Sequence, residues 1–189
     1  MYGIHGTTIE ISKNIRSNGF KLSSTGRAGS GVYFWRYFDN NKYAKYLALE
    51  WWKYSKKAGD YNAIKGNMGC CYITVKFNMD NFNTLDLSHG IMREIIRDLI
   101  LTKIDELKNA LNKKVTEEEI ISSLFDTFIK QIEIEQNIII DAIITNVPPP
   151  KGSTGAVGKY VGSCAEAIIL TNLNMIEKIN YSEESQDDY

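Results

Sequence analysis

Three short stretches of this sequence combine reactive side chains with glycines or apolar residues. They are residues 5–7 (His-Gly-Thr), residues 31–34 (Gly-Val-Tyr-Phe) and residues 165–170 (Ala-Glu-Ala-Ile-Ile-Leu). A glutamate that opens an apolar run is costly to bury unless something uses its charge. Its carboxylate can stabilise a developing positive charge, and a tyrosine ring can stack on a cation.

Residues of these types also have ordinary structural explanations. Glu166 alone can face solvent at a strand end, where charged residues are common. Tyr43 and Tyr46 lie in an aromatic stretch with Trp51, Trp52 and Tyr54, whose rings can belong to the core. His5 is one of two histidines, and the other, His89, falls between a strand and a helix as a loop or capping residue would. The order histidine, tyrosine, glutamate, with each residue in a strand or loop context, favours a functional site.

In this order the three stretches resemble the ADP-ribosyltransferase family. They are most similar to its His-Tyr-Glu branch, which includes diphtheria-toxin-like enzymes and poly(ADP-ribose) polymerases. The resemblance implies that NAD is the substrate, with no metal. It implies that Glu166 accepts the ribose 2′-hydroxyl and stabilises an oxocarbenium-like transition state. His5 would hold a ribose hydroxyl, and Gly6 and Thr7 would belong to the NAD site, where a glycine allows close approach to the backbone.

The resemblance also implies that aromatic rings hold the nicotinamide. Tyr33 would stack on the positively charged pyridinium, and a second tyrosine on the following helix would close the other side. Tyr46 matches that residue best, and Tyr43 is the rival. Position 164, two before the glutamate, is a cysteine. The arginine-modifying branch carries Glu or Gln there, so arginine is a less expected acceptor.

Composition places the chain among ordinary globular proteins. Of its residues, 43% are hydrophobic and 24% are charged. A chain of 189 residues is long enough to form one domain with a real hydrophobic core. The formal net charge of −1 creates no global attraction to nucleic acid or to acidic membranes. Three cysteines, Cys70, Cys71 and Cys164, indicate buried reduced thiols rather than disulfides or zinc. Without a signal peptide or a membrane-length apolar run, we expect a soluble, cytoplasmic protein.

Periodicity and capping signals predict an alternation of strands and helices. The predicted strands are Tyr2–His5, Val32–Tyr37, Cys70–Phe77, Asn83–Leu87, Ile138–Thr145, Glu166–Thr171 and Met175–Tyr181. The predicted helices are 8–18, capped by Thr7 or Thr8, 39–57, capped by Asp39, 88–109, and 116–136, opened by a capping box of Thr116 and Glu119. Glycine-rich loops at 23–31 and 151–163 are expected at the rim of the site.

These elements predict an α+β fold built on antiparallel strands. The resemblance gives it the form of a split antiparallel β-sandwich: a single catalytic domain over residues 1–181, a helical hairpin insertion at about 88–136, and a disordered acidic tail at 182–189. The hairpin would cover the cleft, thicken the core, or bind a partner such as an antitoxin.

The expected function is that of a mono-ADP-ribosyltransferase that modifies a protein or nucleic acid, such as an intracellular bacterial or phage toxin or effector. Two alternatives stay open: an NAD glycohydrolase that uses the same three residues, and an inactive protein of this fold that binds a nucleotide or a partner protein.

Overall fold

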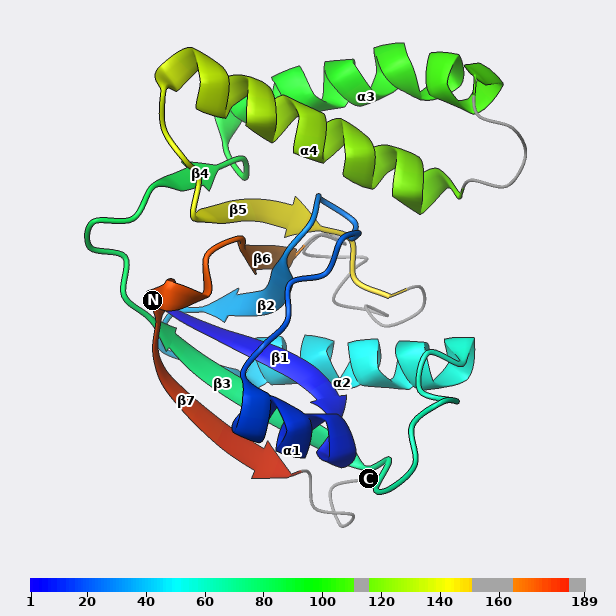
Figure 1. Cartoon of the computed structure of the whole chain (residues 1–189), viewed down its shortest axis with the longest axis vertical. Coiled ribbons are helices and arrows are strands. Elements are labelled where there is room, and N and C mark those ends of the chain that lie inside the picture. Colours follow the sequence, from blue (N-terminus) through cyan, green and yellow to red (C-terminus); the bar gives the residue numbers. More distant parts are fainter. Residues whose placement is uncertain (111–115, 151–164, 184–189) are drawn as a thin grey trace.

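The computed structural model describes residues 1–110, 116–150 and 165–183, and within them seven strands and four α-helices form an α+β fold (Figure 1). The predicted loop 151–163, Cys164 and residues 184–189 of the predicted tail lie outside the described residues. The strands are β1 (Tyr2–Thr8), β2 (Val32–Tyr37), β3 (Cys70–Phe77), β4 (Thr84–Asp86), β5 (Ala142–Val147), β6 (Ala165–Leu170) and β7 (Ile176–Glu183). The helices are α1 (Ile9–Asn18), α2 (Lys42–Ala58), α3 (Gly90–Ala110) and α4 (Glu117–Gln136), with a 3₁₀ turn at Leu173–Met175.

The strands form one hydrogen-bonded sheet in the order β4-β5-β6-β2-β1-β3-β7. Five neighbouring pairs are antiparallel, as predicted for most of the fold, but β4 and β5 are parallel, so the sheet is mixed at this edge. Parallel neighbours need a long crossover connection. The α3–α4 hairpin is that connection, because it joins the end of β4 to the start of β5.

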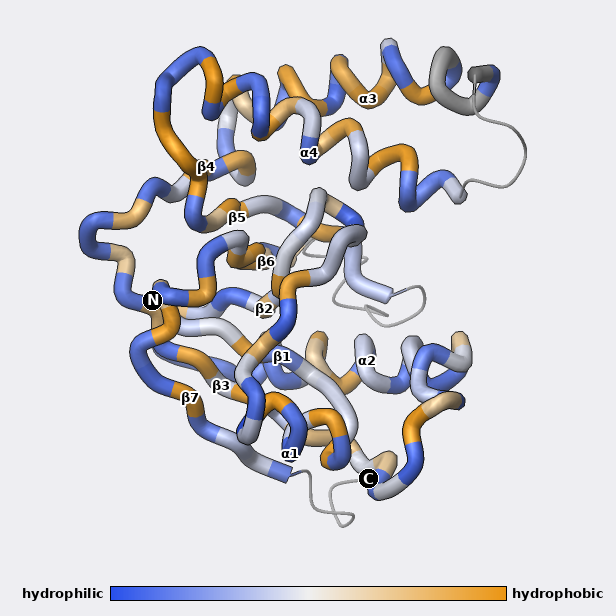
Figure 2. Tube along the Cα trace, in the orientation of Figure 1, coloured by the Kyte–Doolittle hydropathy of each residue, from blue (hydrophilic) through white to orange (hydrophobic). Residues whose placement is uncertain are grey.

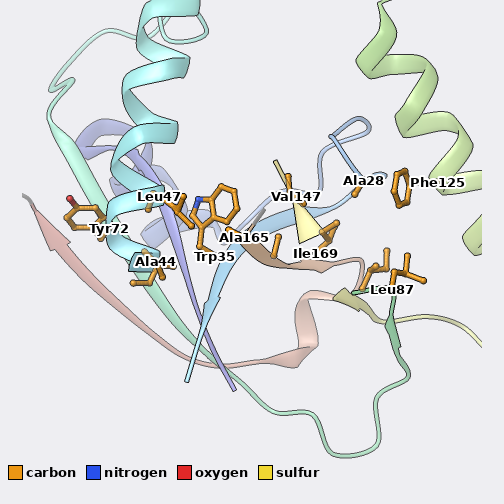
Figure 3. Close-up of a cluster of buried hydrophobic side chains, with 14 of the residues drawn as sticks. Ala28, Trp35, Ala44, Leu47, Tyr72, Leu87, Phe125, Val147, Ala165 and Ile169 are labelled. Carbon is orange, nitrogen blue, oxygen red and sulfur yellow. The ribbon is translucent and has the colours of Figure 1, made fainter. Parts of the chain in front are cut away.

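Both faces of the sheet are buried, and each packs against different helices. One face, here called the α2 face, contacts α2, α3 and α4 through a cluster that includes Ile4, Trp35 and Ile169. Figure 3 shows Trp35 of β2 between Leu47 of α2 and the strands β5 and β6. The opposite α1 face carries Phe34, Ile73 and Ile168 and contacts α1. The hydrophobic core therefore has two parts, one on each face of the sheet.

The pairing between β1 and β2 stops partway along the strands. Only three residues of β1, Tyr2 to Ile4, pair with β2, whereas all seven pair with β3. Before Trp35, at Val32 to Phe34, β2 keeps its pairing with β6 but does not pair with β1. The sheet thus splits between β1 and β2. His5 lies on the β1 side of this split, and Tyr33 lies on the β2 side.

Local capping explains where two helices begin. The Thr8 hydroxyl accepts a hydrogen bond from the Ile11 amide at 3.0 Å, which makes Thr8, not Thr7, the N-cap of α1. At α4, Thr116 and Glu119 form the predicted capping box. Asp39 was predicted to cap the next helix, but α2 begins at Lys42, after Asn41.

The largest differences from the predicted strand boundaries are in β1, β5 and β7. The first strand continues to Thr8 because β3 pairs with it along its whole length. Residues 138–141, the first part of a predicted strand, precede β5 rather than forming part of it. The last strand includes Ser182 and Glu183, which were predicted to be disordered. The predicted strands 32–37 and 70–77 match β2 and β3 at both ends, and the boundaries of the remaining elements shift by a few residues, as expected at element ends.

The two helices of the crossover are amphipathic, and Figure 2 shows apolar and hydrophilic stretches alternating along both. Ile120, Leu124, Phe125 and Ile129 of α4 are buried. On α3, Ile91 and Leu101 are largely exposed. A partner at residues 88–136 stays a prediction. In the described part of the chain, no helix has the length and apolar character needed to cross a membrane.

Candidate active site

A cleft of about 670 Å³ opens where β1 and β2 separate. Its lining includes His5 and Gly6 on β1, Tyr33 on β2, Phe20 after α1, and Trp51 of α2. The predicted rim loop 23–31 also contributes several residues, and the first turn of α4 closes one side. The volume lies within the usual range for pockets that bind small molecules and cofactors.

The His5 ring bridges the split. Its Nδ1 lies 2.9 Å from the carbonyl oxygen of Tyr33, and its ring contacts Phe20 and Phe34 edge-on or tilted. Because a carbonyl oxygen only accepts hydrogen bonds, Nδ1 must donate. Burial lowers the pKa of His5 below its usual 6.5, so the ring is neutral at pH 7. Its Nε2 is then an acceptor suited to a hydroxyl group.

The lowered pKa of His5 predicts a pH dependence of stability. Below about pH 6.5 the unfolded chain binds a proton that the folded ring resists, so the free energy of unfolding falls as the pH decreases through that value, and the contribution is complete above it. We expect wild type to lose more stability than His5→Gln between about pH 7.5 and about pH 5.5 in urea titrations. His89→Gln, at an exposed position, is the matched control and should behave as wild type. If His5→Gln and wild type show the same pH dependence of stability, the pKa of His5 is not lowered by folding.

Tyr33 is held by the loop that precedes it. Its hydroxyl donates to the Gly29 carbonyl oxygen at 2.6 Å and accepts from the Ala28 amide at 2.8 Å. Burial raises the pKa of this hydroxyl well above its usual value, so the phenol stays protonated. A Cβ on Gly26 would lie 2.5 Å from the Tyr33 ring, so the loop packs directly on the ring. Tyr33 thus offers the cleft an aromatic surface rather than a titrating group.

Glu166 lies on β6 beside a partner that the sequence analysis did not single out. Its Oε2 accepts a hydrogen bond from Nη1 of Arg36 at 2.8 Å, and the two side chains are 31% and 15% exposed. The Arg36 guanidinium lies 4.6 Å from the centre of the Phe38 ring, and its Nε has no hydrogen-bond partner among the described residues. Glu166 is not among the described residues that line the cleft.

Strand alternation relates these three residues to the two faces of the sheet. Ile4, Trp35 and Ala167 are opposite one another on β1, β2 and β6 and therefore share a face. Tyr33, two residues before Trp35, points to that same α2 face, whereas His5 and Glu166, each next to a member of the row, point to the α1 face. The structure brings His5 and Tyr33 together and leaves Glu166 on the third adjacent strand.

The other predicted contacts to NAD are not in the cleft. Thr7 is buried, paired with Cys71 of β3, and does not line it. Tyr43 and Tyr46 stack on each other on an exposed side of α2, with ring centres 6.3 Å apart. The aromatic residue of α2 that lines the cleft is Trp51, and the Arg27 guanidinium lies 4.8 Å from its ring centre.

Within the described residues, no three His, Cys, Asp or Glu side chains come together in the way a metal ion requires. Cys70 and Cys71 are both buried, as the sequence predicts.

No family model, curated protein or solved structure matches this chain.

Proposed function

We propose that this protein is an NAD-dependent mono-ADP-ribosyltransferase that modifies a macromolecule, either a protein or a nucleic acid. The observation that carries the proposal is the sheet order. The strands bearing His5, Tyr33 and Glu166 are the consecutive neighbours β1, β2 and β6, although they are far apart in sequence. A cleft of about 670 Å³ opens at the point where β1 and β2 separate.

The residues of the cleft fit the chemistry of NAD. A neutral His5 ring, fixed through Nδ1, leaves Nε2 to accept a hydrogen bond from a ribose hydroxyl. Tyr33 and Trp51 give aromatic surfaces for a nicotinamide or adenine ring. Bound NAD supplies a glycosidic bond whose cleavage builds positive charge on the ribose, and a nearby carboxylate stabilises that charge. Glu166 is the carboxylate we assign to that role, on the same face of the sheet as His5.

The ion pair of Glu166 with Arg36 favours a second candidate, an inactive protein of this fold that binds a nucleotide. Arg36 neutralises the carboxylate at 2.8 Å, and Glu166 lies outside the described lining of the cleft. Such a protein would bind NAD in the cleft that His5 and Tyr33 line, without cleaving it. An NAD glycohydrolase, in which water is the acceptor, would use the same residues as the transferase.

Incubation with NAD labelled in its adenylate half, in a lysate and in buffer alone, separates the three functions. Release of nicotinamide together with label on macromolecules supports the transferase, and digestion of the product by protease or by nuclease identifies the class of acceptor. Release of nicotinamide with only free ADP-ribose selects the glycohydrolase. Calorimetric binding without release selects the binding protein. NAD that is neither bound nor consumed would overturn the proposal.

A further inference from the structure

The loop 23–31, which leads into β2, lies against helix α4 of the crossover (Figure 1). It enters the cleft on one side, where Thr25, Gly26 and Arg27 belong to the lining. On its other side it faces Ser122 and Asp126 of α4. The residues in contact are separated by 96 positions in the chain, so the contact is a product of the fold.

Both carboxylate oxygens of Asp126 accept hydrogen bonds from this loop. Oδ1 accepts a hydrogen bond from the Ser30 amide at 2.7 Å, and Oδ2 accepts one from the Ser30 hydroxyl at 2.8 Å. Four residues earlier on α4, the Ser122 hydroxyl accepts from the Gly26 amide at 3.2 Å. Hydrogen bonds to a charged acceptor are stronger than those between neutral groups. Asp126 therefore makes the stronger of these two attachments between α4 and the loop.

The same short loop determines where Tyr33 lies. The two hydrogen bonds of its hydroxyl go to Ala28 and Gly29, the residues directly before Ser30. Ala28 packs against Phe125, the neighbour of Asp126 on α4, as Figure 3 shows. Gly29 has φ of +100°, and a Cβ there would lie 2.8 Å from Asp126 Oδ1. Helix, loop and Tyr33 hydroxyl thus form one continuous set of contacts.

On the cleft side of the loop, Arg27 contacts three other parts of the chain. Its Nη1 donates to the carbonyl oxygen of Pro148, just after β5, at 2.7 Å. Its Nε lies 3.4 Å from a carboxylate oxygen of Glu118 at the start of α4, and its guanidinium covers the ring of Trp51 on α2. A shift of α4 relative to the sheet would move both sides of the loop together. The crossover helix is consequently part of the cleft's wall.

We propose that Asp126 is a positioning residue that, through Ser30 and the loop 23–31, fixes the Tyr33 ring and thereby sets the affinity of the cleft for NAD. The ligand in this statement rests on the proposed function, whereas the attachment of the loop does not. Asp126 does not line the cleft itself, so it acts through Tyr33 rather than on the substrate.

The test compares Asp126→Ala with the conservative Asp126→Asn and with Asp98→Ala, which removes an exposed carboxylate from α3. The first readout is amide hydrogen exchange at Ala28, whose N–H binds the Tyr33 hydroxyl. We expect exchange at least about tenfold faster in Asp126→Ala, a partial effect in Asp126→Asn and none in Asp98→Ala. Exchange at Ile73 in β3 should stay slow, which separates local release of the loop from unfolding.

The second readout is NAD turnover. We expect Asp126→Ala to raise KM for NAD about tenfold while kcat changes by less than about threefold, because positioning of an aromatic wall contributes mainly to binding. Unchanged exchange at Ala28 would overturn the proposal, and so would faster exchange with unchanged KM. If no variant handles NAD, the proposed function has failed, and exchange at Ala28 still decides whether Asp126 holds the loop on Tyr33.

Discussion

Glu166→Gln is expected to slow the release of nicotinamide from NAD by about 100- to 1,000-fold, the usual cost of removing one preorganised electrostatic stabiliser. Glutamine has nearly the same shape and retains an oxygen that accepts a hydrogen bond from Arg36, so the strand pairing of β6 should survive. What it lacks is the negative charge that offsets positive charge on the ribose. NAD should still bind, because the described cleft is lined by other residues.

Glu177→Gln is the matched control for this substitution. Glu177 is also a strand glutamate paired with a cation, since its Oε1 lies 2.6 Å from Lys76 Nζ, but it is on β7, at the far edge of the sheet. Its replacement should leave nicotinamide release unchanged. Turnover would be measured with equal amounts of the two variants and of wild type. Equal turnover by all three would mean that Glu166 serves only as the ion-pair partner of Arg36, and the binding protein would become the better candidate.

The fold was predictable where the sequence pattern and the pairing of strands depend on the same residues. The strands 32–37 and 70–77 are confirmed at both ends because each is an apolar or alternating run with loop residues on either side. The run 138–145 misleads because apolar character does not say where pairing begins. Asp141 is the last residue before β5, and its hydrogen bonds are not those of a strand ladder. Its backbone carbonyl oxygen accepts hydrogen bonds from two amides after β6, and its side chain accepts one from the Asn83 amide.

The cleft was predictable in part, and α2 illustrates why. The stripe of Ala44, Leu47, Ala48 and Trp51 recurs at helical spacing and does pack toward the sheet, so it brings Trp51 to the cleft. Tyr43 and Tyr46 lie off that stripe and are more than a third exposed. The helical period contained the signal that Trp51, rather than either tyrosine, would face the site.

Arg36 and Asp126 had no comparable signal in the sequence. Arg36 meets Glu166 across 130 positions, and Asp126 meets Ser30 across 96. Such contacts depend on which strands become neighbours and on where the crossover helices pack, and a local pattern does not encode either. The residues that hold a site in place are consequently harder to find in a sequence than the residues whose chemistry makes them conspicuous.

Gly6→Ala is expected to lower the free energy of unfolding by about 3 kcal/mol or more, at the upper end of the cost of overpacking a core. A Cβ on Gly6 would overlap the carbonyl oxygen of Ala48 and lie 2.6 Å from its carbonyl carbon. These are backbone atoms in the middle of α2, and Ala48 itself is fully buried. The helix cannot give way without leaving the sheet, and with it Trp51 would leave the cleft.

This packing explains Gly6 without a ligand, whereas the resemblance explains it by close approach of NAD, and the two explanations predict different results. Urea unfolding of Gly6→Ala measures the first, and calorimetric titration with NAD measures the second. Gly69→Ala is the control, because its Cβ would meet the end of the flexible Ile9 side chain at 3.0 Å, a contact that should change stability by less than about 1 kcal/mol. Unchanged stability of Gly6→Ala with lost NAD binding would show that the ligand, not Ala48, requires the glycine. If Gly6→Ala loses stability and Gly69→Ala does not, glycine is required at position 6 by the contact between β1 and α2. The same contact brings Trp51 to the cleft.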